Sequence, residues 1–131
     1  MVKHISEKRR LVKTYFFNDE IYGQILDSLV IACTDVYFIH GSSVMLTKRN
    51  VYPRKDWWGI GGRMISGENP LDSIKRKTKE ETGLNLKRNR FKFFGVYSTS
   101  FALRKQKPQK NGSHTLNLTF MRRSTKKKEA R

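Results

Sequence analysis

The sequence predicts a single α/β domain in which a mixed β-sheet packs against a helix. The chain has 131 residues, which suits one domain and is long enough to bury a core. Segments rich in β-branched and aromatic residues alternate with two segments of helical periodicity. We expect the domain to span residues 15–121, between a basic arm at 1–14 and a basic tail at 122–131.

The first part of this domain is predicted to be a helix followed by a hairpin. Residues 18–29 carry apolar side chains at helical spacing, with Asn18 or Asp19 as a suitable N-cap, and these apolar residues are Tyr22, Ile25, Leu26 and Leu29. Residues 30–40 have the composition of a strand, and 44–48 return after the turn at 41–43.

The second helix has the clearest boundaries. A loop at 50–56 and a short strand at 57–60, ending at Gly61-Gly62, precede it. Its ends are marked by residues typical of those positions: Asn69 as N-cap, Pro70 at the first helical position, Asp72 in the first turn and Gly83 after the last turn.

Two strands are predicted after this helix. Residues 91–103 are rich in aromatics, and residues 102–113 form a basic loop. Residues 114–121 alternate large apolar side chains with threonine and asparagine, as a half-buried strand does.

The charge of the chain is strongly positive. It carries 28 Lys and Arg against 11 Asp and Glu, a formal net charge of +17. No acidic residue occurs between Glu81 and Glu129, a stretch with 13 Lys and Arg. Such a field attracts nucleic acid or nucleotide phosphates. The alternative is a solvated basic surface without a specific partner.

The cysteine content and hydropathy suggest a cellular setting. One Cys excludes an internal disulfide framework. The longest apolar runs are too short to span a bilayer, and the first residues lack the apolar stretch of a signal peptide. We therefore expect a cytoplasmic protein with no membrane partner.

One segment has the composition of a cation and phosphate site. Lys77, Glu80 and Glu81 share one helix face, because residues three and four apart are neighbours on a helix. Two carboxylates and a carbonyl of the preceding glycine turn are hard oxygen ligands suited to Mg²⁺. The alternative is a solvated helix with pairs such as Arg76–Glu80.

The spacing of this segment resembles the Nudix box, G-x5-E-x7-R-E-U-x-E-E-x-G-U, where U is a bulky aliphatic residue. Seven positions match in one register, and they are Gly62, Glu68, Arg76, Glu80, Glu81, Gly83 and Leu84. The resemblance extends from about residue 29 to residue 120. It implies a Nudix-like αβα sandwich with a mixed sheet, and a hydrolase that uses Mg²⁺ or Mn²⁺.

The same resemblance assigns structural roles within the box and shows where this chain departs from the usual pattern. Glu68 and Arg76 would pair to hold the loop against the helix, while Gly62 and Gly83 shape the turns. Nudix domains usually add a long helix after the last strand, whereas here the predicted tail follows, so that C-terminal helix is missing. Two positions depart from the box, because Lys77 replaces the first Glu of R-E-U-x-E-E and Thr78 replaces its aliphatic residue. The lysine argues against ordinary pyrophosphate cleavage.

The GDP-mannose mannosyl hydrolase branch of the family also lacks that Glu. Its pattern is similar to this chain at several places, namely Asp35, Lys48-Arg49, Gly61-Gly62-Arg63 and Gly95-Val96-Tyr97. This similarity implies a GDP-mannose-type nucleotide sugar as substrate, attacked at the sugar carbon. Glu81, the Gly61 carbonyl and Glu80 would bind the metal. Asp35 would contact sugar or base, and Arg49 and Arg63 the diphosphate, with Arg63 also catalytic.

The branch places a catalytic base where His114 lies. A water nucleophile needs a proton acceptor, and this chain has only three histidines. His114 borders the long loop beside the expected cleft, so we expect it to be the base. The alternative is a polar strand end facing water.

Two other functions stay open at this level. One is an ordinary Nudix pyrophosphatase weakened by Lys77. The other is a catalytically degenerate module that binds nucleotide or nucleic acid through the basic C-terminal half. Three alternatives stay open for the face that the missing helix would cover: a shorter fold is stable without it, the helix at 18–29 takes its place, or a partner subunit in a homodimer covers it.

Overall fold

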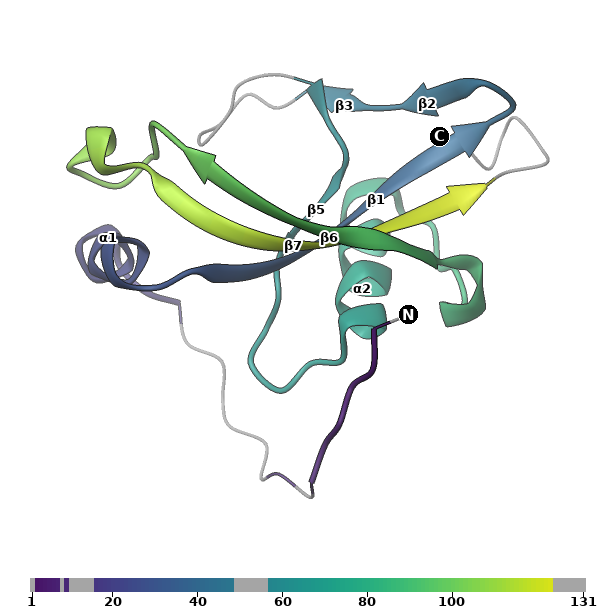
Figure 1. The fold of residues 1–131 in the computed structure, drawn as a ribbon, viewed down its shortest axis with the longest axis horizontal. Coiled ribbons are helices and arrows are strands. Elements are labelled where there is room, and N and C mark those ends of the chain that lie inside the picture. The colour runs from purple at the N-terminus through teal and green to yellow at the C-terminus, as the bar shows by residue number, and fades with distance from the viewer. Residues whose placement is uncertain (1, 8, 10–15, 49–56, 124–131) are drawn as a thin grey trace.

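The computed structural model describes residues 2–7, 9, 16–48 and 57–123 (Figure 1). Its helices are α1 (Asp19–Ser28) and α2 (Pro70–Thr82), with short 3-10 turns η1 (Arg88–Arg90) and η2 (Gln109–Asn111). The strands are β1 (Ile31–His40), β2 (Ser43–Met45), β3 (Thr47–Lys48), β4 (Trp57–Trp58), β5 (Ile60–Arg63), β6 (Lys92–Phe101) and β7 (Ser113–Arg123).

The main sheet is mixed, as the sequence predicts. Strand β1 lies at its centre and pairs in parallel with β7 along one edge. Strands β2 and β5 pair antiparallel with its other edge, and β6 pairs antiparallel with β7. Strands β3 and β4 form a separate two-stranded ribbon.

Strand alternation gives the sheet two different faces. Even-numbered side chains of β1 and β7 face α2, which lies behind the sheet in Figure 1. The core lies there, and its buried members are Val36, Phe38, Ile60, Ile74, Phe91 and Phe120. Odd-numbered side chains of both strands face the other way, so that second face is available for a binding site.

Both helices begin at the caps that the sequence predicts. The Asn18 side chain accepts a hydrogen bond from the Ile21 amide at 2.9 Å, and the Asn69 side chain accepts one from the Leu71 amide at 2.9 Å. Helix α2 ends at Gly83, whose φ of 78° is left-handed and favours glycine. A hydrogen bond between two hydroxyls fixes α2 to β1, because Thr34 Oγ1 and Ser73 Oγ lie 2.7 Å apart in the core.

The structure shifts several predicted boundaries. The returning strand predicted at 44–48 is divided between β2 and β3, and the strand predicted at 57–60 is divided between β4 and β5. Strand β5 continues through both glycines to Arg63, because they pair with Asp35 and Thr34 of β1.

The C-terminal boundary also moves. Strand β7 extends two residues past the predicted end at Met121, and Arg122, assigned to the tail, is buried beside Phe38 in the register of β1 and β7. Within the described residues no helix follows β7. Neither described helix is long and apolar enough to traverse a bilayer.

Candidate active site

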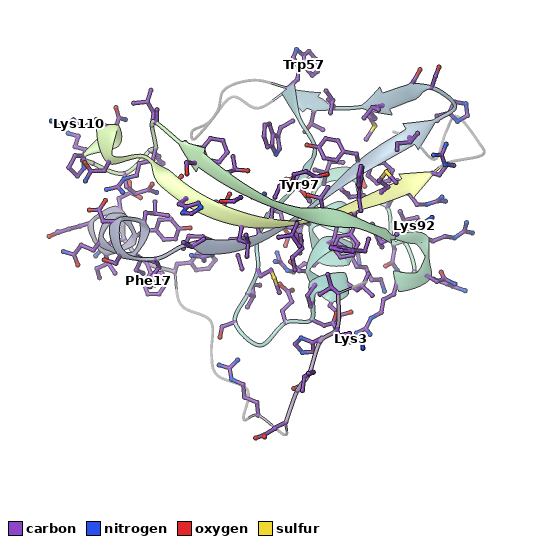
Figure 2. All side chains as sticks on the ribbon, viewed as in Figure 1. Lys3, Phe17, Trp57, Lys92, Tyr97 and Lys110 are labelled. Atoms are coloured by element: carbon purple, nitrogen blue, oxygen red, sulfur yellow. The ribbon has the colours of Figure 1, made fainter. Side chains whose placement is uncertain are left out.

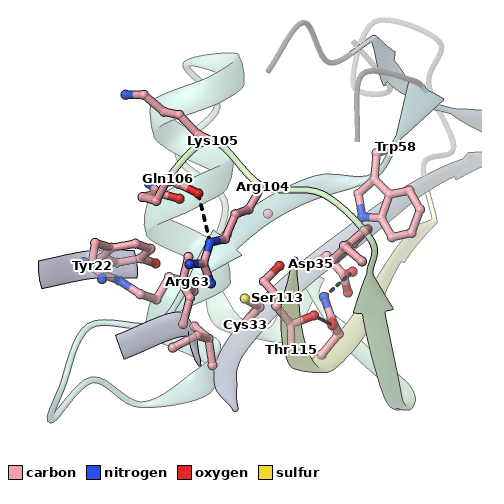
Figure 3. Close-up of a pocket in the computed structure, with 16 residues that line it drawn as sticks. Tyr22, Cys33, Asp35, Trp58, Arg63, Arg104, Lys105, Gln106, Ser113 and Thr115 are labelled. Carbon is pink, nitrogen blue, oxygen red and sulfur yellow. Dashed lines mark hydrogen bonds between the residues drawn. The ribbon is translucent and has the colours of Figure 1, made fainter. Parts of the chain in front are cut away.

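A cavity of about 430 Å³ lies on the face of the sheet opposite α2 (Figure 3). Odd-numbered residues of β1, β5 and β7 form its floor, α1 closes one end, and residues 104–106 overhang it. The side chains that give the cavity its chemistry are Tyr22, Asp35, Trp58, Arg63, Phe101 and Lys105. Cationic, acidic and aromatic groups therefore share one cavity.

Asp35 is the buried acid of this cavity, with 4% of its surface exposed. Its Oδ1 accepts a hydrogen bond from Thr119 Oγ1 at 2.6 Å, and its Oδ2 accepts one from Asn117 Nδ2 at 3.3 Å. Burial raises the pKa of Asp35, although these two hydrogen bonds act in the opposite direction. Each carboxylate oxygen keeps a lone pair for a further donor.

A second cavity, of about 220 Å³, adjoins the first. The two cavities share Asp35, Trp58 and Asn117, and the smaller one adds Tyr37 and Tyr97 as aromatic walls. Asp35 thus lies where a ligand that filled both spaces would pass from one to the other.

Gly61 keeps the floor of the cavity open next to Asp35, its partner across the β1–β5 pairing. A Cβ atom at position 61 would lie 2.2 Å from the Thr34 carbonyl oxygen and 2.7 Å from the Asp35 Cβ. These distances are far inside van der Waals contact, so a side chain at this position would push β5 away from β1. Gly61, which directly precedes the box, is therefore required by packing, independently of any metal.

Arg63 supplies positive charge at the other end of the cavity. Its guanidinium lies over the ring of Tyr22 in α1, with Cζ 5.0 Å from the ring centroid, a cation–π arrangement. Figure 3 shows Arg63 beside Tyr22 and Asp35 beside Trp58, at opposite ends of the space. Stacking on Tyr22 leaves the N–H groups of the guanidinium edge able to bind phosphate oxygens.

Arg104 holds the loop that overhangs the cavity. Only 2% of this residue is exposed. Its guanidinium donates to Asp27 Oδ1 of α1 at 2.6 Å, to the Gly112 carbonyl at 3.1 Å and to the Gln106 carbonyl at 3.0 Å. The hydrogen bond from Arg104 lowers the pKa of Asp27. One buried side chain therefore ties residues 104–112 to α1 and fixes the width of the cavity.

The box itself is braced by Glu68 and Arg76, as the sequence predicts. Arg76 Nε donates to Glu68 Oε2 at 2.8 Å and Nη2 donates to Oε1 at 3.1 Å, a bidentate pair. Arg76 Nη2 also donates to the Arg63 carbonyl, and the Ile65 amide donates to Glu68 Oε1 at 2.9 Å. Partial burial opposes ionisation of Glu68, but the hydrogen bonds from Arg76 and Ile65 outweigh it and lower its pKa. The brace holds the carbonyl of Arg63, and with it the end of β5, against α2.

We expect Glu68→Gln to lower the free energy of unfolding by about 1–3 kcal/mol at pH 7, because charge-assisted hydrogen bonds are replaced by neutral ones. The folded pKa lies below the ordinary 4.5, so the stabilisation is fully present above 4.5 and is lost as pH falls through the folded value. Denaturant titrations at pH 7 and pH 3 should therefore show that the difference in the free energy of unfolding between parent and variant becomes smaller in acid. A difference in the free energy of unfolding that is the same at both pH values would contradict this expectation. So would an equal difference in Glu20→Gln, the control at an exposed position.

The acidic face of α2 is arranged differently from a metal site. The Lys77 ammonium lies 3.3 Å from Glu80 Oε2 and 3.8 Å from Glu81 Oε1, and Arg76 Nη1 lies 3.1 Å from Glu80 Oε1. The hydrogen bond from Arg76, with Lys77 adding to it, lowers the pKa of Glu80. Among the described residues no three His, Cys, Asp or Glu side chains gather as a metal-binding group. The residues expected to hold Mg²⁺ or Mn²⁺ thus do not fit a divalent ion as arranged, because a cationic side chain lies between them.

The structure brings together some of the predicted site residues and separates others. Asp35, Gly61 and Arg63 line one cavity, whereas Glu80 and Glu81 lie on α2 beyond Gly62. Arg49, predicted to bind the diphosphate, lies outside the described residues.

His114 does not reach the cavity, in contrast to the expectation from sequence. Its neighbours Ser113 and Thr115 line the cavity, and strand alternation directs His114 to the opposite face. There its Nε2 lies 2.7 Å from Ser98 Oγ. The geometry therefore does not favour the assigned role as base.

Several cavity residues have no signal that sequence analysis could use. Tyr22 has helical periodicity but its contact with Arg63 depends on where α1 docks. Arg104 is one basic residue in a basic loop, and nothing local indicates its burial. Asn117 follows the predicted alternation of β7, which could have placed it on one face with Thr119, but not beside Asp35.

Comparisons with known proteins agree with the fold. The family model of the NUDIX domain matches residues 31–131. No curated protein sequence gives a significant match.

Solved structures share the fold. A MutT/nudix family protein from Enterococcus faecalis superposes with a TM-score of 0.58 at 20% identity, over 73% of this chain and 37% of that one. A MutT protein from Bacillus halodurans gives 0.53 at 26% identity, over 72% and 57%. A bifunctional NMN adenylyltransferase/ADP ribose pyrophosphatase from Francisella tularensis, complexed with AMP and a manganese ion, gives 0.57 at 18% identity, over 80% and 30%. This chain thus spans between about a third and just over half of the length of these proteins.

Proposed function

The chain belongs to the Nudix family, and from that membership we propose that it hydrolyses a nucleoside diphosphate derivative bound in the cavity opposite α2. The observation that carries the proposal is the combination of groups in that cavity. Arg63 and Lys105 are cationic, Trp58 and Phe101 are aromatic, and Asp35 is a buried acid. Phosphate oxygens suit the cations, and planar bases suit the aromatic walls.

Within the described part of the cavity, Asp35 is the group placed to accept a proton. A general base must lie within hydrogen-bond reach of the water that it activates. Asp35 lies on the cavity floor and burial raises its pKa toward the working range of a base, whereas His114 lies on the other face. We therefore assign the base role to Asp35 instead of His114.

The favoured substrate is a nucleotide sugar of the GDP-mannose type, cleaved at the sugar carbon. Water would lose a proton to Asp35 while its oxygen bonds to that carbon. The carbon–oxygen bond to the diphosphate would break, and the nucleoside diphosphate would leave with the electron pair. Arg63 would stabilise the charge that develops on the leaving group. Lys77 in the box supports this route over attack at phosphorus, because it removes a carboxylate that the ordinary reaction uses.

A product assay tests the proposal against its two rivals. The purified protein is incubated with a panel of nucleotide sugars, dinucleoside polyphosphates and nucleoside triphosphates, each with and without Mg²⁺ or Mn²⁺. Free sugar and nucleoside diphosphate would indicate attack at carbon. Sugar phosphate and nucleoside monophosphate would indicate an ordinary pyrophosphatase. Absence of turnover across the panel would overturn the hydrolase proposal and favour a binding module.

Metal dependence is a separate question in this chain. Nudix hydrolases generally use divalent ions, and the Francisella protein was solved with manganese. A divalent ion, when bound, would neutralise the diphosphate charge. The arrangement of Lys77 determines whether one can bind on α2.

Three further expectations stay proposals. The basic stretch after Glu81 supports nucleic-acid binding only through its charge, and Figure 2 shows Lys92 and Lys110 projecting from opposite ends of the molecule. The single Cys supports a cytoplasmic setting. A homodimer would cover apolar side chains that remain exposed on the sheet, such as Val96 and Leu116.

A further inference from the structure

Lys77 occupies a defined position on α2. It is three residues before Glu80 and four before Glu81, the two spacings that place side chains side by side on a helix. Its ammonium lies 3.3 Å from one carboxylate and 3.8 Å from the other. The side chain is 21% exposed, so it packs against the protein for most of its length.

A glycine opposite the helix makes room for this packing. A Cβ atom at Gly62 would lie 3.0 Å from Lys77 Cε and 3.4 Å from Lys77 Nζ. The lysine stem therefore runs across the bare backbone of β5, directly behind the part of β5 that lines the cavity. The ammonium is held between the helix acids and the strand by this contact.

Electrostatics decides what else can bind there. An ammonium and a divalent ion between the same two carboxylates would repel each other at contact distance, where the interaction of charges is strong. Mg²⁺ and Mn²⁺ bind here only if the ammonium leaves both acids. Glu80 is also held by Arg76, at 3.1 Å, so two cations already neutralise this face.

We infer that Lys77 is the resident cation of the Nudix helix in this chain, occupying the place between Glu80 and Glu81 that a divalent ion would take. The folded protein then does not bind Mg²⁺ or Mn²⁺ at this face, and the positive charge beside Gly62 is part of the polypeptide. This inference concerns cation binding alone. It is independent of the proposed hydrolysis, because Mn²⁺ binding is measured without substrate.

The test uses Mn²⁺ as probe, measured by the loss of its free electron paramagnetic resonance signal on titration into the full chain. We expect Lys77→Gln to bind Mn²⁺ at least about tenfold more tightly than the parent, because removal of the ammonium leaves two adjacent carboxylates facing one site. The matched control is Lys79→Gln, which removes the same charge from an exposed position on the same helix and should leave Mn²⁺ affinity near that of the parent. Adding Glu81→Gln to Lys77→Gln should abolish the gain.

Three results would overturn the inference. The first is parent binding of Mn²⁺ as tight as that of Lys77→Gln and sensitive to Glu81→Gln. The second is no gain in either Lys77→Gln or Lys77→Met when both variants show parental circular dichroism and thermal unfolding. Equal gains in Lys77→Gln and Lys79→Gln would also overturn it, because net charge alone would then explain the effect. Two different substitutions of Lys77 are used so that a folding defect in one of them does not decide the result.

Discussion

Replacing Asp35 with asparagine is expected to reduce turnover of a cleaved nucleoside diphosphate derivative by at least about 100-fold, the usual scale for loss of a positioned base. The amide cannot take a proton from water, whereas the buried carboxylate can. Thr119 and Asn117 already donate to its two oxygens, which fixes the orientation of the group. Steady-state kinetics on the substrate found in the product assay, together with thermal unfolding, measures both consequences.

Two matched variants complete this experiment. Asp72→Asn neutralises an acid that pairs with Arg88 on the outer side of α2, and it should leave turnover within about twofold. His114→Gln removes the alternative base and, on the geometry described, should also have little effect. Loss of turnover in His114→Gln with a nearly normal Asp35→Asn would reverse the assignment.

Replacing Arg104 with methionine is expected to lower the free energy of unfolding by about 3 kcal/mol, within the range for breaking a buried, charge-assisted network. Methionine preserves much of the volume of the buried stem but offers no donor. The buried carbonyl of Gly112 loses its partner, and Asp27 loses the contact that lowers its pKa. The loop over the cavity should then separate from α1.

Urea denaturation of the parent and variant gives this difference directly. The neighbouring Lys105→Met is the matched control, because Lys105 is exposed and its loss should change stability by less than about 0.5 kcal/mol. Asp27→Asn should fall between the two, since one of several Arg104 bonds is weakened. Equal stability of Arg104→Met and Lys105→Met would show that the network is unimportant.

Most of the fold follows from local sequence signals. Both helices were predicted within one residue of their observed ends, because Asn18, Asn69, Pro70 and Gly83 have side chains or backbone preferences that act locally. The ends of β5 were not predicted, because its extension through Gly61 and Gly62 depends on pairing with β1. Strand β7 likewise continues to Arg123 because β1 runs beside it.

The candidate site was predictable only where spacing along the chain determines it. The Glu68–Arg76 pair and the shared face of Lys77, Glu80 and Glu81 follow from helix periodicity and the box. The face of the sheet on which His114 lies depends on the strand register to within one residue, because successive side chains of a strand point to opposite faces. The enclosure of Asp35 and Arg104 depends on residues from distant parts of the chain, and no local pattern contains that information.

The parallel pairing of β1 with β7 also has a consequence for how the molecule is made. Asp35 and its hydrogen-bond partner Thr119 are 84 residues apart in sequence, and the central strand cannot complete its long edge until the last strand exists. Closing so long a segment is entropically unfavourable, and contacts of this kind slow folding. On the ribosome β1 is synthesised well before β7, so the backbone N–H and C=O groups along that edge of β1 lack their final partners until the last strand has been made.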